Sequence, residues 1–355
     1  MAHDHPIALA LAELLQRHAC VEEGVLADYI PELAHVDPDL FAIAVATVDG
    51  RTFAVGDHGA LFTIQSASKP FTYGHALELH GRDRVLARVG VEPTGDAFNS
   101  IIKLDAANRP HNPCVNSGAI AVTSLLRELD ATTSVKQLLD TFNRFAGRTL
   151  GIDLPVFTSE RTHGHRNRAI AHLMLHFGMI EGEVDPILDL YFQQCSIQVT
   201  CADLALMAAT LANAGVNPKT GQRAIDAAYV RDVLTVMHSC GMYDYAGQWA
   251  YTVGLPAKSG ISGGILAVVP GKLGIACYSP RVDRHGHSVR GLRVFEDLAA
   301  NFALHPFEPQ KSANAGDIDA LFQKRDKAHA PPQASLLESP ASYTPDRGRA
   351  PEAGE

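Results

Sequence analysis

Residues 40–64, LFAIAVATVDGRTFAVGDHGALFTI, decide the fold class of this chain. The run at 40–48 is rich in β-branched and small apolar residues, and an Asp-Gly pair separates it from a second run at 51–55. An Asp-Gly pair between two such runs is a strong signal for a β-hairpin. A third apolar run follows at 60–64, so the stretch predicts three consecutive short strands.

Outward from this stretch the hydrophobic pattern changes twice. Residues 70–238 read as a block of helices, and apolar β runs return at 264–269 and 273–278 around a Pro-Gly turn. An amphipathic helix is expected at 288–304. Strands supplied by both ends of the chain most simply form one antiparallel sheet, with the helical block as an inserted lobe. Within the block, helices are expected at 117–128, 135–145, 167–177, 185–194 and 200–214.

This order of elements assigns the chain to the α/β (α+β) class, with one domain over residues 1–307. The sheet lobe would comprise about 35–68 and 245–305, and the helical lobe about 69–240. A ligand site is then expected in the cleft between the two lobes.

Composition and charge narrow the classes of function. The chain is 46% hydrophobic and 19% charged, as expected for a protein with a sizeable core. Asp and Glu outnumber Lys and Arg by 39 to 30, so no global positive field attracts nucleic acid. No apolar stretch reaches the ~18 residues of a membrane span, so no membrane partner is expected. Residues 308–355 are expected to form a disordered tail, because residues 331–355 hold five prolines and no periodicity.

The N-terminus and the cysteines both favour a cytoplasmic protein. Residues 1–23 read as an amphipathic helix and not as a signal peptide, because Glu13 interrupts the apolar stretch and no basic segment precedes it. The six cysteines show no C-x-x-C spacing and lie in apolar runs, which predicts reduced, buried thiols.

Residues 65–70, Gln-Ser-Ala-Ser-Lys-Pro, follow the third expected strand and open a helix. Ser66 and Lys69 lie three positions apart, so on a helix start both side chains share one face. A desolvated lysine can become neutral enough to accept the serine proton, and the helix N-terminus supplies N–H groups for an oxyanion. The pattern S-x-x-K is weak by itself, because Ser100 and Lys103 repeat it without a strand before it.

A Lys-[Ser/Thr]-Gly triplet also occurs twice. The triplet at 219–221 follows Asn217 and Pro218 and reads as a turn between helices. The triplet at 258–260 precedes further small residues and a strand, where a substrate amide could approach the backbone closely. We therefore favour the second triplet as part of a site.

S-x-x-K early, an Asn-containing element midway and K-[ST]-G late is the order found in penicillin-recognising serine enzymes. Six longer blocks are more specific, and together they resemble the serine-dependent glutaminase family. These blocks are ADYIP at 27–31, VGVEPTGDAF at 89–98, HNPCVNSGAI at 111–120, CSIQVTC at 195–201, CGMYD at 240–244 and GLPAKSG at 254–260. The resemblance implies a β-lactamase-like fold, with an antiparallel sheet flanked by helices and an inserted all-helical lobe.

The same resemblance implies hydrolysis of L-glutamine to L-glutamate and ammonia, without a cofactor, by a homo-oligomer that is a tetramer or dimer. Ser66 would be the nucleophile, Lys69 its general base, and Tyr243 the group that passes protons to the leaving ammonia. The backbone N–H groups of Ser66 and Ile261 would form the oxyanion hole. The ends of the substrate would be held by Tyr29, Asn116, Glu160, Asn167 and Tyr191.

The sequence departs from the family pattern at two positions. Ile261 stands where the family often has valine, a change that a backbone donor tolerates. Ser262 stands where many members have a smaller residue, which alters the local shape.

The substrate assignment also agrees with simple chemistry. A free amino acid is a zwitterion, so its pocket needs an acidic group and neutral or positive donors, which Glu160, Asn116 and Asn167 supply. Each residue has a plainer alternative reading. Glu160 could be a solvated loop residue and Tyr191 a half-buried core tyrosine. Asn116 could cap a helix that starts at Ser117.

No metal site is expected from the paired histidines, which are His163 and His165, His172 and His176, and His285 and His287. His172 and His176 lie one helical turn apart, but no H-E-x-x-H pattern surrounds them. Two other functions stay open. A β-lactamase or peptidase-like acylase should carry a signal peptide, and a non-catalytic descendant should have lost Ser66, Lys69 or Tyr243.

Overall fold

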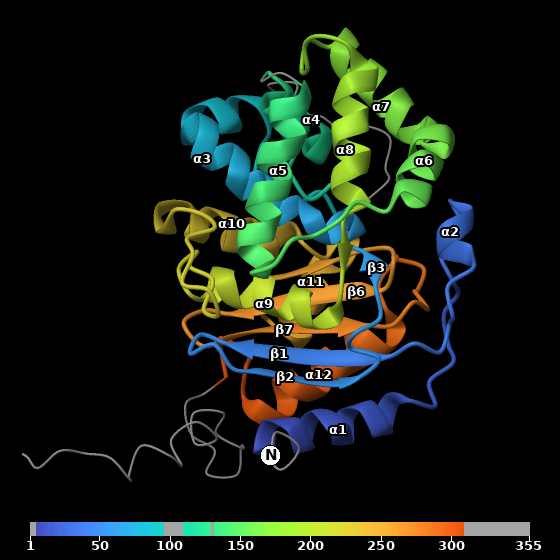
Figure 1. Cartoon of the computed structure of the whole chain (residues 1–355), viewed down its shortest axis with the longest axis vertical. Helices are drawn as coiled ribbons and strands as arrows, with labels where there is room; N and C mark the ends of the chain where they lie inside the picture. Colours follow the sequence, from blue (N-terminus) through green and yellow to red (C-terminus); the bar gives the residue numbers. More distant parts are fainter. Residues whose placement is uncertain (1–4, 96–108, 129–130, 309–355) are drawn as a thin grey trace, which may run out of the picture. The chain divides into compact units, whose positions relative to one another are not determined.

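The structure is a computed structural model that describes residues 5–95, 109–128 and 131–308 of the chain (Figure 1). The second S-x-x-K pattern, at Ser100 and Lys103, and almost all of the expected tail at 308–355 lie outside the described residues.

Five strands form one antiparallel sheet in the order β2-β1-β7-β6-β5. The strands are β1 Ala42–Thr47, β2 Thr52–Gly56, β5 Ala257–Ser259, β6 Gly264–Val269 and β7 Leu273–Tyr278. The two hairpins meet where β1 pairs with β7, and Ala44 lies opposite Ala276 in that register. The prediction that both ends of the chain supply one antiparallel sheet is therefore confirmed.

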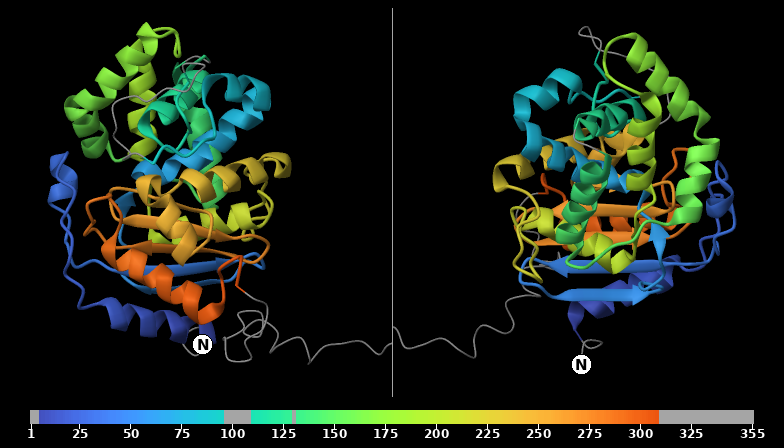
Figure 2. Two further views of the ribbon diagram at one scale, coloured as in Figure 1. Left: turned by 180° about the vertical axis from the view of Figure 1, so that it is seen from behind. Right: turned by 45° about the horizontal axis from the view of Figure 1, so that its top comes forward.

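Both faces of this sheet are covered, which explains why β1, β6 and β7 are buried at every position. Helix α9 (Cys201–Ala212) packs on one face, against β1, β6 and β7. A Cβ on Gly274 of β7 would lie 2.2 Å from the backbone nitrogen of Ala209, so only glycine allows this close packing. Helices α1 (Pro6–His18) and α12 (Val289–Phe302) contact the strands from the opposite side (Figure 2).

The third apolar run does not join this sheet, contrary to the single sheet expected from the sequence. Only Phe62–Thr63 form a strand, β3, which pairs with β4 (Gln198–Val199) in a separate two-stranded sheet. The chain turns away after β2 at Gly56, whose φ is +71° and whose Cβ would meet the Phe41 carbonyl oxygen.

The helices expected from the sequence are present, with boundaries shifted by a few residues. They are α3 Lys69–Arg88, α4 Asn116–Arg127, α5 Ala131–Ala146, α7 His165–His176, α8 Val184–Cys195, α9 and α12. Helix α9 of the block lies on the sheet, because its side chains are apolar and buried nearly all round. The remaining helical segments are α2 Pro31–Ala34, η1 Gln65–Ser68, α6 Leu154–His163, α10 Ala227–Cys240, η2 Tyr243–Tyr245 and α11 Ala246–Thr252.

Two further expectations concern the cysteines and the membrane. All six cysteines are free thiols, and all but Cys20 are buried as expected. Cys20 is exposed because it follows the last turn of α1, outside the apolar face of that helix. No helix in the described ranges is long and apolar enough to cross a membrane.

Candidate active site

One cavity of about 510 Å³ gathers almost all of the residues that the sequence singled out. Its walls come from the segment before α2, from η1, α4, α6, α7 and α8, and from the loops around η2, β5 and β7. Eight of the predicted residues line it, namely Tyr29, Ser66, Asn116, Glu160, Asn167, Tyr191, Tyr243 and Ile261. The ninth, Lys69, is buried and contacts the lining residue Asn116.

A strained turn presents Ser66 to the cavity. Gln65, the residue before it, has φ +49°, a left-handed conformation that is rare for a side chain of this kind. The Ser68 hydroxyl donates to the Gln65 carbonyl oxygen at 2.6 Å, and the Gln194 side chain donates to Ser68 at 2.9 Å. These bonds hold the turn between β3 and α3, so Ser66 lies at a fixed position.

Lys69 begins α3 and is only 1% exposed. Its Nζ donates to the Asn116 Oδ1 at 2.7 Å and to the Cys114 carbonyl oxygen at 3.0 Å. Both acceptors are neutral, and none of the ion pairs found among the described residues includes this amine. Burial lowers the pKa of Lys69 to about 8, because the ammonium loses its hydration.

The bond from Lys69 also sets the direction of two amides. Asn116 accepts from Lys69 through Oδ1, so its Nδ2 faces Asn167 and donates to the Asn167 Oδ1 at 3.0 Å. The Asn167 Nδ2 then remains as a donor at the wall of the cavity. The helix-cap alternative for Asn116 is wrong, because α4 starts at Asn116 and its N-cap is Val115.

Glu160 is a buried acid in the middle of α6, with 3% of its surface exposed. The solvated-loop alternative is therefore wrong. The Tyr29 hydroxyl donates to the Glu160 Oε1 and also lies 3.0 Å from the Gln65 Oε1. Burial raises the pKa of Glu160, and hydrogen bonds with Tyr29 and Gln65 act in the opposite direction. Such a carboxylate is suited to bind a positively charged group in the cavity.

Tyr243 lies beside Ser66 in the cavity. It opens η2 with φ +55°, a second strained non-glycine residue at the site. Burial raises the pKa of its phenol, and a side-chain hydrogen bond with Ser66 acts in the opposite direction. Tyr191 is 3% exposed, so it is buried more fully than the half-buried core tyrosine of the alternative reading; it belongs to a core cluster and also lines the cavity, and its side chain hydrogen-bonds Cys195.

The triplet at 258–260 forms β5 and the turn that carries Ile261. A Cβ on Gly260 would lie 2.8 Å from the Ile64 carbonyl oxygen, at the start of the nucleophile turn. The absence of a side chain at Gly260 therefore allows the Ile64 carbonyl to approach closely. From the sequence, a substrate amide was expected to approach the backbone here. The other triplet, at 219–221, lies in a turn between α9 and α10, as expected.

The structure adds residues that sequence reasoning missed. Gln65, Cys195, Arg166 and Arg284 also line the cavity. Gln65 directly precedes Ser66, but nothing in local propensity signals a left-handed glutamine there. Of the paired histidines, His163 lines the cavity and His285 forms an ion-pair contact with Asp244 at 2.8 Å. No group of three metal-ligating side chains is found in the described part of the chain.

Comparison with known proteins shows to which family the chain belongs. The family model described as glutaminase matches residues 24–307. The chain belongs to the glutaminase family. A curated glutaminase of Trichormus variabilis is 56% identical over 87% of this chain and 92% of its own length. A glutaminase of Corynebacterium glutamicum is 46% identical over 84% of the chain and 73% of its own length.

Solved structures give the same result for the fold of this glutaminase. Mglu in its glutamate form superposes with a TM-score of 0.83 at 42% identity, covering 86% of this chain and 71% of that one. A probable glutaminase, ybaS, superposes with a TM-score of 0.80 at 40% identity, covering 83% and 96%. The neighbours share the β-lactamase-like fold, so the fold class and the family expected from the sequence are confirmed. The chain is a hydrolase.

Proposed function

We propose that this glutaminase hydrolyses L-glutamine to L-glutamate and ammonia through a γ-glutamyl ester of Ser66, with Lys69 as the general base. The observation that carries the mechanism is the environment of the Lys69 amine. A neutral amine has two N–H donors and one lone pair. The two donors bond to Cys114 and Asn116, so the lone pair is left to accept the Ser66 proton.

The cavity offers an acidic group for the α-ammonium of the substrate and an amide donor for its α-carboxylate. The carboxylate of Glu160 would bind the α-ammonium, with Tyr29 holding its Oε1 in place. The Asn167 Nδ2, oriented through Asn116, would donate to the α-carboxylate. Tyr191 would close the wall between them. The glutamate form of Mglu, a relative of the same fold, supports an amino-acid ligand of this length.

The reaction would then run in two stages. Ser66 attacks the side-chain carboxamide carbon while its proton passes to Lys69, and the backbone N–H groups of Ser66 and Ile261 stabilise the oxyanion. Tyr243 gives a proton to the leaving ammonia, and the proton on Lys69 later restores it. Water then attacks the ester with Lys69 again as the base.

The direct test is ammonia release from L-glutamine, L-asparagine and D-glutamine. Ser66→Ala should abolish release, whereas Ser100→Ala, at the second S-x-x-K pattern, should cost little. Mass spectrometry of the quenched wild type should show the glutamyl adduct on Ser66. An active Ser66→Ala enzyme would overturn the whole mechanism.

We also propose a cytoplasmic homo-oligomer, a tetramer or dimer, whose catalytic domain ends near residue 307. The end of the matched family model at residue 307 supports this boundary. Sedimentation should give the oligomeric state. Deletion of 312–355 should leave the rate of ammonia release unchanged.

A further inference from the structure

Lys258 is a second buried lysine at the site, and it has no part in the steps above. It lies on β5 with 0% of its surface exposed, and its Nζ is 3.9 Å from the centroid of the Tyr243 ring. The amine donates to the carbonyl oxygen of its own neighbour, Ser259, at 2.7 Å. The ion pairs found among the described residues do not include it.

Packing does not explain a lysine at this position. A buried amine without a counter-ion is costly to desolvate, and removing such charges in favour of apolar side chains often stabilises a protein. Methionine has a similar length and would fill the same space. We therefore look for a chemical role of the Lys258 amine at the Tyr243 ring, which it contacts.

Three basic side chains lie near the Tyr243 ring, namely His287, Lys69 and Lys258. His287 lies parallel to the ring, with an interplanar angle of 5° and centroids 6.0 Å apart. Burial lowers the pKa of His287 to about 3, so this imidazole is neutral near pH 7. Lys69 lies further from the same ring centroid, at 5.7 Å. Burial lowers the pKa of Lys258 well below its ordinary value as well, but its amine is the closer of the two lysine amines to the ring, at 3.9 Å. Negative charge that forms on Tyr243 would therefore be stabilised first by Lys258.

We propose that Lys258 is a positioning residue for Tyr243, which fixes the ring beside Ser66 and stabilises the phenolate that forms as ammonia departs. This inference rests on the proposed function. When the C–N bond of the tetrahedral intermediate breaks, its electron pair goes to nitrogen, which takes the Tyr243 proton. The proton that Lys69 took from Ser66 then passes to the phenolate, so both groups return to their starting states.

The test compares two substrates, because ammonia must gain a proton as it leaves and the leaving group of an activated ester need not. The γ-(4-nitrophenyl) ester of L-glutamate forms the same ester of Ser66, but its leaving group departs as a stable anion. Lys258→Met should lower kcat/KM for L-glutamine by about 100-fold, the usual size of a proton-transfer contribution. It should leave kcat/KM for the ester within about threefold of wild type, because that acylation bypasses Tyr243. Tyr243→Phe should show the same difference between the two substrates.

The matched control is Lys219→Met, which changes the lysine of the other Lys-[Ser/Thr]-Gly triplet in an exposed turn. It should leave both substrates unaffected. A second readout is the melting temperature, which Lys258→Met should leave unchanged or raise. Equal losses with both substrates would overturn the inference, because they indicate a role in packing or in the attack by Ser66.

Two further outcomes are decisive. If Lys258→Met does not fold by circular dichroism, the ratio of ester to glutamine turnover is measured in Lys258→Gln; a raised ratio supports the inference and an unchanged ratio overturns it. If Tyr243→Phe itself shows no difference between the substrates, the proton role in the proposed function is wrong. A normal Lys258→Met beside a selective Tyr243→Phe overturns the role of Lys258 alone.

Discussion

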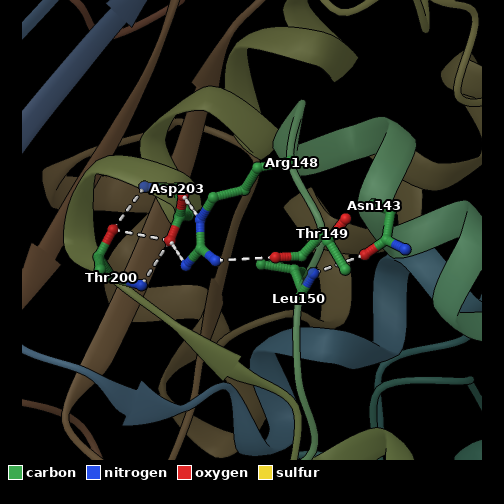
Figure 3. Close-up of polar contacts among 6 residues, drawn as sticks. All are labelled: Asn143, Arg148, Thr149, Leu150, Thr200 and Asp203. Atoms are coloured by element: carbon green, nitrogen blue, oxygen red, sulfur yellow. Dashed lines mark hydrogen bonds and ion pairs between the residues drawn. The ribbon is translucent and has the colours of Figure 1, made fainter.

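Two clusters of charged side chains in this glutaminase differ in how their charges are compensated. At the start of α9, Asp203 accepts from the Arg148 Nε at 2.7 Å and Nη2 at 2.5 Å (Figure 3). The same carboxylate accepts from the Thr200 backbone N–H at 2.8 Å and from its hydroxyl at 2.7 Å. At the active site, Lys69 and Lys258 bond only to neutral oxygens.

The difference shows which charges serve the fold and which serve the reaction. The Asp203 cluster ties the loop after α5 to the N-terminus of α9, directly after β4. Because β4 pairs with β3, and β3 leads into the Ser66 turn, the cluster supports the nucleophile from outside the cavity. Its charges compensate one another, whereas the amine of Lys69, the proposed general base, has no counter-ion among the described residues.

The largest effect that tests this difference between the two clusters is expected for Lys69→Met. Loss of the general base should lower kcat by about 1,000-fold, or ~4 kcal/mol of transition-state stabilisation. The melting temperature should not fall, because a buried unpaired amine is replaced by an apolar chain. Steady-state kinetics and calorimetry measure the two effects, with Lys219→Met as the surface control. A large drop in melting temperature would show that Lys69 is a structural group.

The pH profile of the wild type tests the same amine. Burial lowers the pKa of Lys69 to about 8, and only the neutral form can accept the Ser66 proton. Well below that pKa the neutral fraction falls tenfold per pH unit, so kcat/KM should rise about 50-fold from pH 6 to pH 8 and level above about pH 9. A profile that is flat over this range would contradict the assignment of Lys69 as the base.

Glu160 is a buried acidic residue of the cavity wall, and its contribution should appear in substrate binding. Glu160→Gln should raise KM for L-glutamine by about 10- to 100-fold, because a charge-assisted contact becomes a neutral one. The exposed Glu183→Gln is the control. Asparagine should be a very poor substrate, since its carboxamide falls about one bond length short of Ser66 when both ends are held. An unchanged KM in Glu160→Gln places the ammonium elsewhere.

The sequence predicts the five-stranded sheet better than it predicts the surroundings of Ser66. The hairpins can be predicted because their apolar runs and turn residues are local features of the sequence. The separate pairing of Phe62 with Val199, and the buried place of Glu160 on α6, depend on contacts between distant segments. Period and propensity carry no information about such contacts.

The same limit applies within the site. Spacing and the strand-to-helix context make Ser66 and Lys69 candidates, and the resemblance to a family with the same blocks selects them and predicts their partners. The stacking of Lys258 on Tyr243 and the left-handed turn at Gln65 follow from three-dimensional packing. A lysine in a short motif looks the same in sequence whether it lies on an exposed turn or under an aromatic ring.

Changes in the Asp203 cluster should lower stability and leave activity unaffected, the reverse of what is expected for Lys69→Met. Arg148→Met leaves the Asp203 carboxylate without its ion-pair partner, so the free energy of unfolding should fall by about 1–2 kcal/mol, a value reduced because Arg148 is half exposed. Arg84→Met, which breaks a more exposed pair with Glu128, should cost at most ~0.5 kcal/mol. Denaturant unfolding gives both values. A loss of activity without a loss of stability would assign Arg148 to the reaction.

The smallest effect concerns the pH dependence of stability at Asp203. Burial alone would raise the pKa of this carboxyl, but hydrogen bonds from Arg148 and Thr200 outweigh it and hold the pKa below its ordinary value. A carboxyl with a lower pKa in the folded state stabilises the protein above its unfolded pKa of about 3.9. That contribution is lost as the pH falls through the folded-state pKa.

Asp203→Asn removes this titration and keeps the size of the side chain. Between pH 5 and pH 2 the unfolding free energy of the variant should therefore fall less steeply than that of the wild type, because one proton fewer is taken up on unfolding. Arg148→Met should flatten the same slope in part, since it removes the main group that lowers the Asp203 pKa. Urea unfolding at a series of pH values measures the slopes. Parallel slopes in the wild type and Asp203→Asn would mean that Asp203 titrates alike in both states, and its pairing with Arg148 would then add nothing to the fold.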